Sequence, residues 1–274
     1  MSNALNRKNQ VSMTNPLRRN FQEVSQYRDV LMQLVRQFLT LRYRRTVLGY
    51  LWTLLNPLLM MSVTAVVFAT LFKLDLVTYS IFLFAGMVPW TFFAMTVTQS
   101  CTAFISNEGL IKKIYLPKVI FPLSLTIGIL IDSALSLLAL FALILIAGAP
   151  VSWALLFIPL SYFLLVLFSL GVALIMAVAT VFFRDLQYVI SVVIQAWFFL
   201  TPVMYRHESL TGKVKGLVAF NPMVPFIELF RAPLQLGTLP STSAIVASTL
   251  FAVSSLAIGL CVFLYQEKKL VFRL

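Results

Sequence analysis

The polar segment 106–118 concentrates charge between two long apolar stretches of the chain. It carries Glu108, Lys112 and Lys113 in a region otherwise poor in ionisable side chains. Such charges could bind a complementary surface on another protein, or they could simply be solvated. The residues of the segment do not distinguish a partner-binding segment from a solvated one, so the surrounding elements must be considered.

The same segment has the signals of a short helix. Oxygens of Ser106 or Asn107 can accept hydrogen bonds from the free N–H groups at a helix start. Pro117 would end the helix before the next apolar run. The apolar positions at helical spacing are Leu110, Ile111 and Ile114. We therefore expect a small amphipathic helix at the membrane edge, on which a cytoplasmic partner could dock.

The sequence carries few groups suited to enzymatic chemistry. His207 is the one histidine, which excludes histidine-based triads and metal clusters. The phosphate-binding pattern G-x-x-x-x-G-K-[ST] does not occur. Asp132 is the clearest charge inside an apolar stretch, where it would cost about 2.5–3.5 kcal/mol if ionised and unpaired. It either bonds to nearby serines or faces a wet cavity.

Aromatic side chains are abundant, with 24 Phe, 9 Tyr and 4 Trp. Aromatic rings combine large apolar area with restricted geometry. They suit contact with lipid, and they equally suit stacking on the C–H faces of sugars in an uncharged conduit. The candidates for such a path are Trp90, Phe92, Phe93, Trp197, Phe198, Phe199 and Tyr205.

Composition assigns the chain to the polytopic membrane proteins. It is 60% hydrophobic and 11% charged over 274 residues. The net charge of +12 comes from bases in the N-terminal region and in loops beside apolar stretches. Topology and anionic lipid explain these bases better than nucleic acid does, so no nucleic-acid partner is expected. Cys101 and Cys261 both lie in apolar segments, which argues against a disulfide framework.

Hydropathy predicts six membrane-spanning helices in the region 47–274. Each is near the roughly 20 residues that a bilayer requires. Most of the 21 Lys and Arg residues then fall on one side, which predicts that both termini are cytoplasmic. The expected spans are 48–72, 79–103, 119–147, 153–182, 187–205 and 243–265.

Two further elements flank the spans. Residues 1–27 are expected to form a cytoplasmic tail, and 28–46 an amphipathic helix in the interface plane. This helix could be a plain anchor or a surface against which a partner packs. The external loop 206–242 contains an apolar stretch broken by prolines, which predicts re-entrant or interfacial helices. A cap without a transport role is the alternative.

Six motifs in order resemble one family, the permease subunits of type 2 ABC exporters, in the branch that exports polysaccharides such as O-antigen and teichoic acid. The resemblance begins near residue 28 and continues to the C-terminus. The motifs are LRYRRTVLGYLWTLLNPLL (41–59), FLFAGMVPW (82–90), SNEGLIKKIYLPK (106–118), FRDLQYV (183–189), FLTPVMY (199–205) and FNPMVPFIELFRAPL (220–234).

The resemblance implies an all-α integral membrane protein with six transmembrane helices, an N-terminal interface helix, a coupling helix at 104–118 and external re-entrant helices. It implies a homodimer in the bacterial inner membrane with two copies of a cytoplasmic ABC ATPase, which binds MgATP, so that this chain needs no cofactor. The cargo would be a lipid-linked glycan that passes between protomers. Residues expected to couple to the ATPase are Asn107, Glu108, Leu110, Ile111, Lys112, Lys113, Arg36 and Arg44.

Three alternatives remain at this stage. An ABC exporter of a small lipid or drug is the nearest. A secondary transporter or flippase needs no ATPase, but proton-coupled pumps usually carry several ionisable groups inside the membrane. A membrane-embedded enzyme would need a cluster of catalytic side chains. A neighbouring ATPase gene among genes of glycan synthesis would distinguish these possibilities.

Overall fold

The computed structural model describes residues 25–43, 48–146, 148, 151–206 and 212–274, and regular structure in these ranges is helical throughout. Most of the predicted tail, Arg44 and His207 lie outside the described residues. The helices in chain order are α3 (Arg28–Tyr43), η2 (Gly49–Leu51), α4 (Trp52–Phe72), α5 (Leu76–Ser100), α6 (Glu108–Lys113), α7 (Ile120–Ile146), η3 (Trp153–Phe157), α8 (Ile158–Phe182), α9 (Leu186–Leu200), α10 (Gly212–Ala219), α11 (Met223–Arg231), the π-helical turn η5 (Ala232–Leu236) and α12 (Thr242–Arg273).

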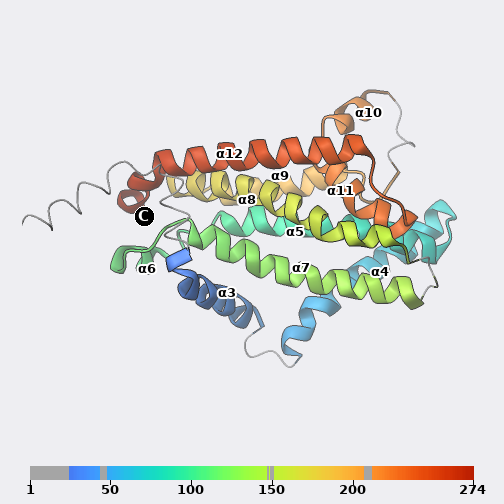
Figure 1. Ribbon diagram of the computed structural model, residues 1–274, viewed down its shortest axis with the longest axis horizontal. Helices are drawn as coiled ribbons and strands as arrows, with labels where there is room; N and C mark the ends of the chain where they lie inside the picture. Colours follow the sequence, from blue (N-terminus) through green and yellow to red (C-terminus); the bar gives the residue numbers. More distant parts are fainter. Residues whose placement is uncertain (1–24, 44–47, 147, 149–150, 207–211) are drawn as a thin grey trace, which may run out of the picture.

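The long helices lie side by side along the long axis of the molecule (Figure 1). Within the described ranges, four segments are long and apolar enough to cross a membrane: Leu76–Ser100, Ile120–Ile146, Trp153–Phe182 and Thr242–Arg273. Two shorter apolar helical segments, Leu58–Phe72 and Leu186–Leu200, accompany them. Helix α6 and the C-terminus lie at one end, and α10 and α11 at the other (Figure 1). We call these the α6 end and the α11 end.

Helix α5 lies at the centre of the bundle. Most of its residues are buried, and Phe92 and Phe93 pack in the main hydrophobic core with residues of α7, α8 and α11. Leu83 is buried in a smaller cluster with Ala65 and Ala69 of α4. Asp75 caps its start, where Oδ2 accepts hydrogen bonds from the amide and hydroxyl of Thr78, each at 2.8 Å. The helix is therefore the element against which the other segments are positioned.

Helices α8 and α12 approach each other at two glycines. A Cβ added at Gly259 would overlap the carbonyl oxygen of Gly171, and one added at Gly171 would overlap the backbone at Ser255. The Ser255 hydroxyl donates to the carbonyl of Phe168 at 2.9 Å across the same contact. In lipid, small residues allow the close backbone packing that holds helices together. This contact joins the third long span to the last one.

Helix α3 packs its apolar face on protein. Val35 is buried, and Leu31 and Leu34 are partly buried against the core at the α6 end. The ring of Phe38 fits over Gly128 of α7, where a Cβ would clash with it. A helix is present over Arg28–Tyr43 of the expected 28–46, and most of its apolar face lies against the bundle, whereas Leu41 is exposed.

We predict that Phe38→Ala loosens α3 from α7. Loss of a fully buried Phe costs about 3–5 kcal/mol, and Phe38 is only partly buried, so the cost here should be about 1–3 kcal/mol. Limited trypsin digestion should then cleave after the exposed Arg36 faster than in the unsubstituted protein. Met32→Ala, at a half-exposed position of the same helix, is the matched control and should leave the rate unchanged. Equal rates in both variants would contradict the packing role.

Candidate functional site

The charged segment at the α6 end forms the predicted helix, but over a shorter range. Helix α6 covers Glu108–Lys113 within the expected 104–118. Lys112 Nζ lies 2.6 Å from Glu108 Oε1, and this hydrogen bond lowers the pKa of Glu108. The predicted cap is wrong: Asn107 occupies the N-cap position, but its side chain donates instead to the carbonyl of Ala103 at 2.8 Å. This hydrogen bond ties the start of α6 to the turn that precedes it.

The apolar side chains of this segment divide between two environments. Ile111 is buried against the core at the α6 end. Leu110 and Ile114 are 36% and 55% exposed, and Tyr115 is 70% exposed. Leu110, Ile111 and Ile114 were expected to share one apolar face. Of these three, only Ile111 is buried in the bundle, so that expectation was wrong in detail. The exposed side chains leave an apolar surface beside Lys112 and Lys113.

Contacts with other helices fix the segment in place. Lys118 Nζ lies 4.0 Å from Glu267 Oε1 of α12, and both side chains are less than one-fifth exposed. Salt screens such a mostly buried ion pair less than it screens a pair on the surface. Arg36 is exposed on α3 and has no described contact with α6. The α6 segment is thus tied to the last long helix.

The aromatic residues of α5 lie inside the helical bundle. Trp90 is 5% exposed, Phe92 1% and Phe93 0%. Phe93 stacks on Phe168 of α8 with ring centroids 5.4 Å apart, and Trp90 meets Trp197 edge to face at 6.3 Å. These three rings form core, so in this arrangement they offer no surface to a translocation path.

The aromatic residues after them are placed differently. Trp197 and Phe198 are partly buried against α5, Phe199 is 71% exposed, and Tyr205 donates from its hydroxyl to the carbonyl of Phe199 at 3.0 Å. Trp197 Nε1 donates to Asn221 Oδ1 at 2.9 Å. The Asn221 amide donates to the carbonyl of Leu200 and the hydroxyl of Thr201. Asn221 therefore joins the end of α9 to the start of α11.

Arg231 makes a second connection at the α11 end. Its guanidinium donates to the carbonyls of Pro202 and Val203 at 2.6 and 2.5 Å, and more weakly to that of Phe82 at 3.4 Å. The same group lies 3.7 Å from the centroid of the Phe82 ring. Gly86 leaves room for it, because an added Cβ would lie 2.7 Å from Nη2. Arg231 thus joins α11, α5 and the segment after α9.

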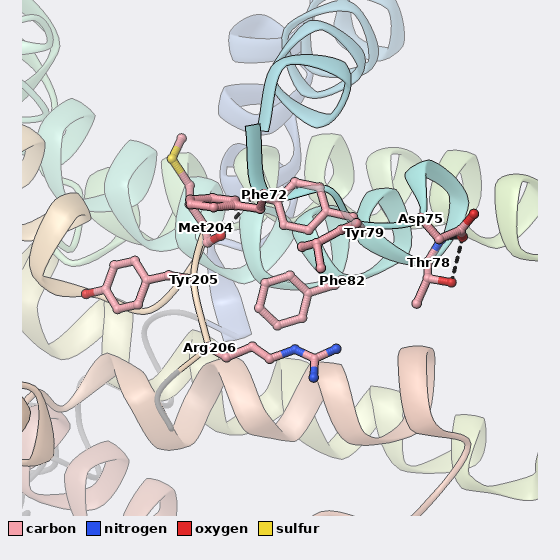
Figure 2. Close-up of a pocket in the computed structure, with 9 residues that line it drawn as sticks. Phe72, Asp75, Thr78, Tyr79, Phe82, Met204, Tyr205 and Arg206 are labelled. Atoms are coloured by element: carbon pink, nitrogen blue, oxygen red, sulfur yellow. Dashed lines mark hydrogen bonds between the residues drawn. The ribbon is translucent and has the colours of Figure 1, made fainter. Parts of the chain in front are cut away.

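A cavity of ≈ 400 Å³ opens beside this connection, between the end of α4, the start of α5 and the segment after α9 (Figure 2). We call it the corner cavity. Tyr79 donates to the carbonyl of Met204 at 2.8 Å and so fixes one wall. Figure 2 shows Arg206 extending beneath Phe82, with Asp75 and Thr78 away from Tyr205. The lining residues are Phe72, Leu74, Asp75, Thr78, Tyr79, Phe82, Met204, Tyr205 and Arg206.

Two more cavities adjoin it through shared walls. One of ≈ 220 Å³ shares Phe72, Met204 and Tyr205 and is also lined by Phe198 and Phe199. Another of ≈ 690 Å³ shares Phe82 and Arg206 and extends along α11 and η5. Three of the predicted path residues, Phe198, Phe199 and Tyr205, therefore line cavities at the α11 end.

Asp132 is buried in α7 at 5% exposure. Next to it, the Ser133 hydroxyl and the Tyr162 hydroxyl of α8 lie 2.9 Å apart, and Tyr162 also donates to the carbonyl of Ser133 at 3.1 Å. Ser136 donates to the Asp132 carbonyl at 3.2 Å. Asp132 therefore lies beside a hydrogen-bonded cluster between α7 and α8. It lines none of the three cavities at the α11 end.

Several residues of the α11 end were missed by sequence reasoning. Phe72 and Asp75 belong to no motif, and Phe82 begins the motif FLFAGMVPW without being singled out within it. The single basic residue in the apolar stretch 216–234, Arg231, was a usable signal. Within the described ranges, no group of three or more His, Cys, Asp or Glu side chains could hold a metal ion.

The architecture defines a polytopic membrane protein with a short charged helix at one end and helices joined by side-chain hydrogen bonds at the other. The sequence pattern of the family described as ABC-2 type transporter matches residues 29–234, which is most of the chain. The chain belongs to this family, as its motifs predicted. It is a membrane permease subunit of an ABC exporter, and in such systems ATP is hydrolysed by a separate subunit.

Relatives named for the export or transport of glycans match most of its length. The O-antigen export system permease protein RfbA of Myxococcus xanthus is 30% identical over 90% of this chain and 95% of its own. The protein of the same name from Klebsiella pneumoniae is 31% identical over 77% of this chain and 82% of its own. The polysialic acid transport protein KpsM of Escherichia coli is 24% identical over 84% and 90%.

Proposed function

We propose that the chain is the transmembrane subunit of an exporter that moves a lipid-linked polysaccharide, O-antigen or a similar glycan, across the bacterial inner membrane. The observation that carries this proposal is the match to RfbA permeases over most of both chains. The more distant match to KpsM also concerns an acidic polysaccharide rather than a drug or small lipid. This supports a glycan cargo over the nearest alternative.

The working unit is a homodimer with six spans in each protomer and two copies of the ATPase. The segments Leu58–Phe72 and Leu186–Leu200 supply the two spans beyond the four long helices. Large parts of α4 and α9 are apolar and exposed in the single protomer, as at Val63, Leu71 and Val192. Such surfaces suit contact with lipid and with a second protomer. The translocation path then runs between protomers.

The α6 end is cytoplasmic, and so are both termini. The C-terminus lies at the α6 end (Figure 1), together with Lys112, Lys113 and Lys118, as a basic cytoplasmic side requires. Helices α10 and α11 then occupy the external side, as the proposed re-entrant region 206–242. Arg44, proposed to contact the ATPase, lies outside the described residues.

Helix α6 is the proposed coupling element, with MgATP bound on the partner. Leu110, Ile114 and Tyr115 leave exposed apolar area beside a Glu108–Lys112 pair and Lys113. A mixed apolar and charged surface is what a protein partner can cover with a hydrophobic centre and a polar rim. Asn107, which bonds to Ala103, supports the helix from inside.

Charge reversal of α6 should uncouple the two subunits. We expect the double variant Lys112→Glu, Lys113→Glu to fold and to lose export, while ATP hydrolysis by the complex no longer responds to cargo. Gly109→Pro should act in the same way, because a proline at this position disfavours the helical conformation of the preceding residue, Glu108, at the start of the short helix. The measurement is ATPase activity and export in the purified, reconstituted complex, with membrane orientation checked in each variant.

A charge swap provides the matched control for that experiment. Glu108→Lys combined with Lys112→Glu keeps the i,i+4 pair, which is worth about 0.2–0.5 kcal/mol in a helix. If the swap restores coupling, the charges only stabilise α6, and the docking role is wrong. Normal cargo-stimulated ATPase activity in the charge-reversed protein would also contradict it.

The overall function is tested in cells that make a lipid-linked glycan but lack their own export permease. Expression of this chain with its ATPase should place the glycan on the cell surface, where antibody labels it. An ATPase variant with its phosphate-binding Lys replaced should abolish the labelling. Surface glycan that does not depend on the ATPase would identify a flippase instead, and no surface glycan from a folded complex would exclude this cargo.

A further inference from the structure

Three cavities at the α11 end share lining residues. Phe72 contributes to the corner cavity and to its smaller neighbour, and Phe82 to the corner cavity and to its larger neighbour. Recesses that bind small molecules have about 300–1,000 Å³, mostly apolar walls and a few placed polar groups. The corner cavity, at ≈ 400 Å³, fits this description. All of its lining residues belong to one chain.

The corner cavity is lined by one acidic and one basic side chain, Asp75 and Arg206, beside the hydroxyl-bearing residues Thr78, Tyr79 and Tyr205. Hydrogen bonding from the backbone and side chain of Thr78 lowers the pKa of Asp75, so this carboxyl group is ionised. Both Thr78 hydrogen bonds fall on Oδ2, and a carboxylate offers about four acceptor positions. Arg206 supplies N–H donors to the same recess (Figure 2). The cavity can therefore both accept from and donate to a neutral polar ligand.

The walls are flat rings held at fixed positions. Tyr79 is fixed by its bond to Met204, and it stacks on Phe82 with ring centroids 5.9 Å apart. Phe72 is 53% exposed and so presents ring surface to whatever enters. A pyranose ring has an apolar C–H face and a rim of hydroxyl groups, which match these rings and the Asp75 and Arg206 side chains. A phosphate group would instead meet the negative charge of Asp75.

We propose that the corner cavity is a subsite for one sugar ring of the exported glycan, with Phe72 as the stacking surface and Asp75 as the hydroxyl acceptor. This inference rests on the proposed function. It places a glycan contact inside each protomer at the end opposite α6, where a sugar that has crossed the membrane would be held before release.

The first test places a photoreactive benzoylphenylalanine at position 72 of the full exporter in glycan-producing cells. A control protein carries it at Phe163 of α8, which is 58% exposed and lines none of the three cavities. Illumination should attach glycan, detected by periodate labelling, at position 72 and not at 163. Phospholipid without glycan at position 72, or equal glycan at both positions, would overturn the subsite.

The second test uses substitutions that preserve the fold. Phe72→Leu keeps apolar volume without a ring face, and Asp75→Asn keeps a good helix cap without the charge. Each should slow export about two- to tenfold, as expected for loss of one aromatic or charge-assisted contact, with complex assembly unchanged. Phe163→Leu should export normally, and unchanged rates in both cavity variants would reject the subsite. Export by the unsubstituted protein is measured in parallel, so failure of the proposed function is seen separately.

Discussion

Alanine in place of Gly259 is expected to lower the thermal unfolding midpoint of the permease by about 3–10 °C. Overpacking a close contact costs about 1–3 kcal/mol, and each kcal/mol corresponds to about 2–4 °C for a chain of this size. The added methyl group meets backbone, the carbonyl of Gly171, rather than the end of a flexible side chain. Helices α8 and α12 must therefore separate, which also strains the Ser255–Phe168 hydrogen bond.

The measurement is unfolding of purified protein in detergent, together with the amount of folded protein in the membrane. Gly216→Ala is the matched control, because nothing lies within 4 Å of its added Cβ. Its midpoint should stay the same or rise slightly, since alanine is the better helix former in α10. An unchanged midpoint for Gly259→Ala would show that the two helices are not held by this contact.

Replacing Arg231 by methionine should have an equally large effect at the other end of the molecule. The carbonyl oxygens of Pro202 and Val203, both in buried residues, would lose their donor, at about 1–3 kcal/mol for each oxygen left unsatisfied. The cation–ring contact with Phe82 would be lost as well. We expect α11 to detach from α5 and from the segment after α9, with lower stability and loss of export.

Gly86→Ala tests the same connection from the opposite side. Its Cβ would lie 2.7 Å from Arg231 Nη2, so the guanidinium must shift and its carbonyl contacts lengthen. The effect should therefore be intermediate between the native protein and the methionine variant. Lys213→Met, at an exposed position on α10, controls for loss of positive charge near the same end. If Gly86→Ala and Arg231→Met both behave like this control, the connection does not hold the cap in place.

Hydropathy predicted where apolar segments lie better than where helices end. The span expected at 243–265 is the start of a helix that continues to Arg273, because Gln266 to Lys269 end an apolar run without ending a helix. The span expected at 187–205 stops at Leu200, because Pro202 keeps the preceding residue, Thr201, out of the helical region at φ −102° and ψ 129°. The helix therefore ends before Pro202.

The placement of side chains was harder to predict than the helices themselves. Trp90, Phe92 and Phe93 are neighbours in sequence, and hydropathy does not say which direction faces the bundle when every direction is apolar. Their burial depends on α8 and α11, which are distant in the chain. The Arg231 and Asn221 connections likewise join segments remote in sequence. Charge density, by contrast, identified α6, because local polarity marks a membrane edge.

The sparse packing of α9 has an evolutionary consequence. In this fully described helix, Ile194 is the one buried residue, while Val189, Val192 and Phe199 are exposed. Substitutions at such exposed positions cost a folded protomer little, usually within about 0.5 kcal/mol. Residues on α9 can therefore change without redesign of the buried core around α5, and the limits on its exposed positions come from the surface that they contact in the assembled exporter. The glycines between α8 and α12 leave no such freedom, because an added side chain would overlap backbone. Selection should therefore act more strongly on these glycines than on the exposed positions of α9.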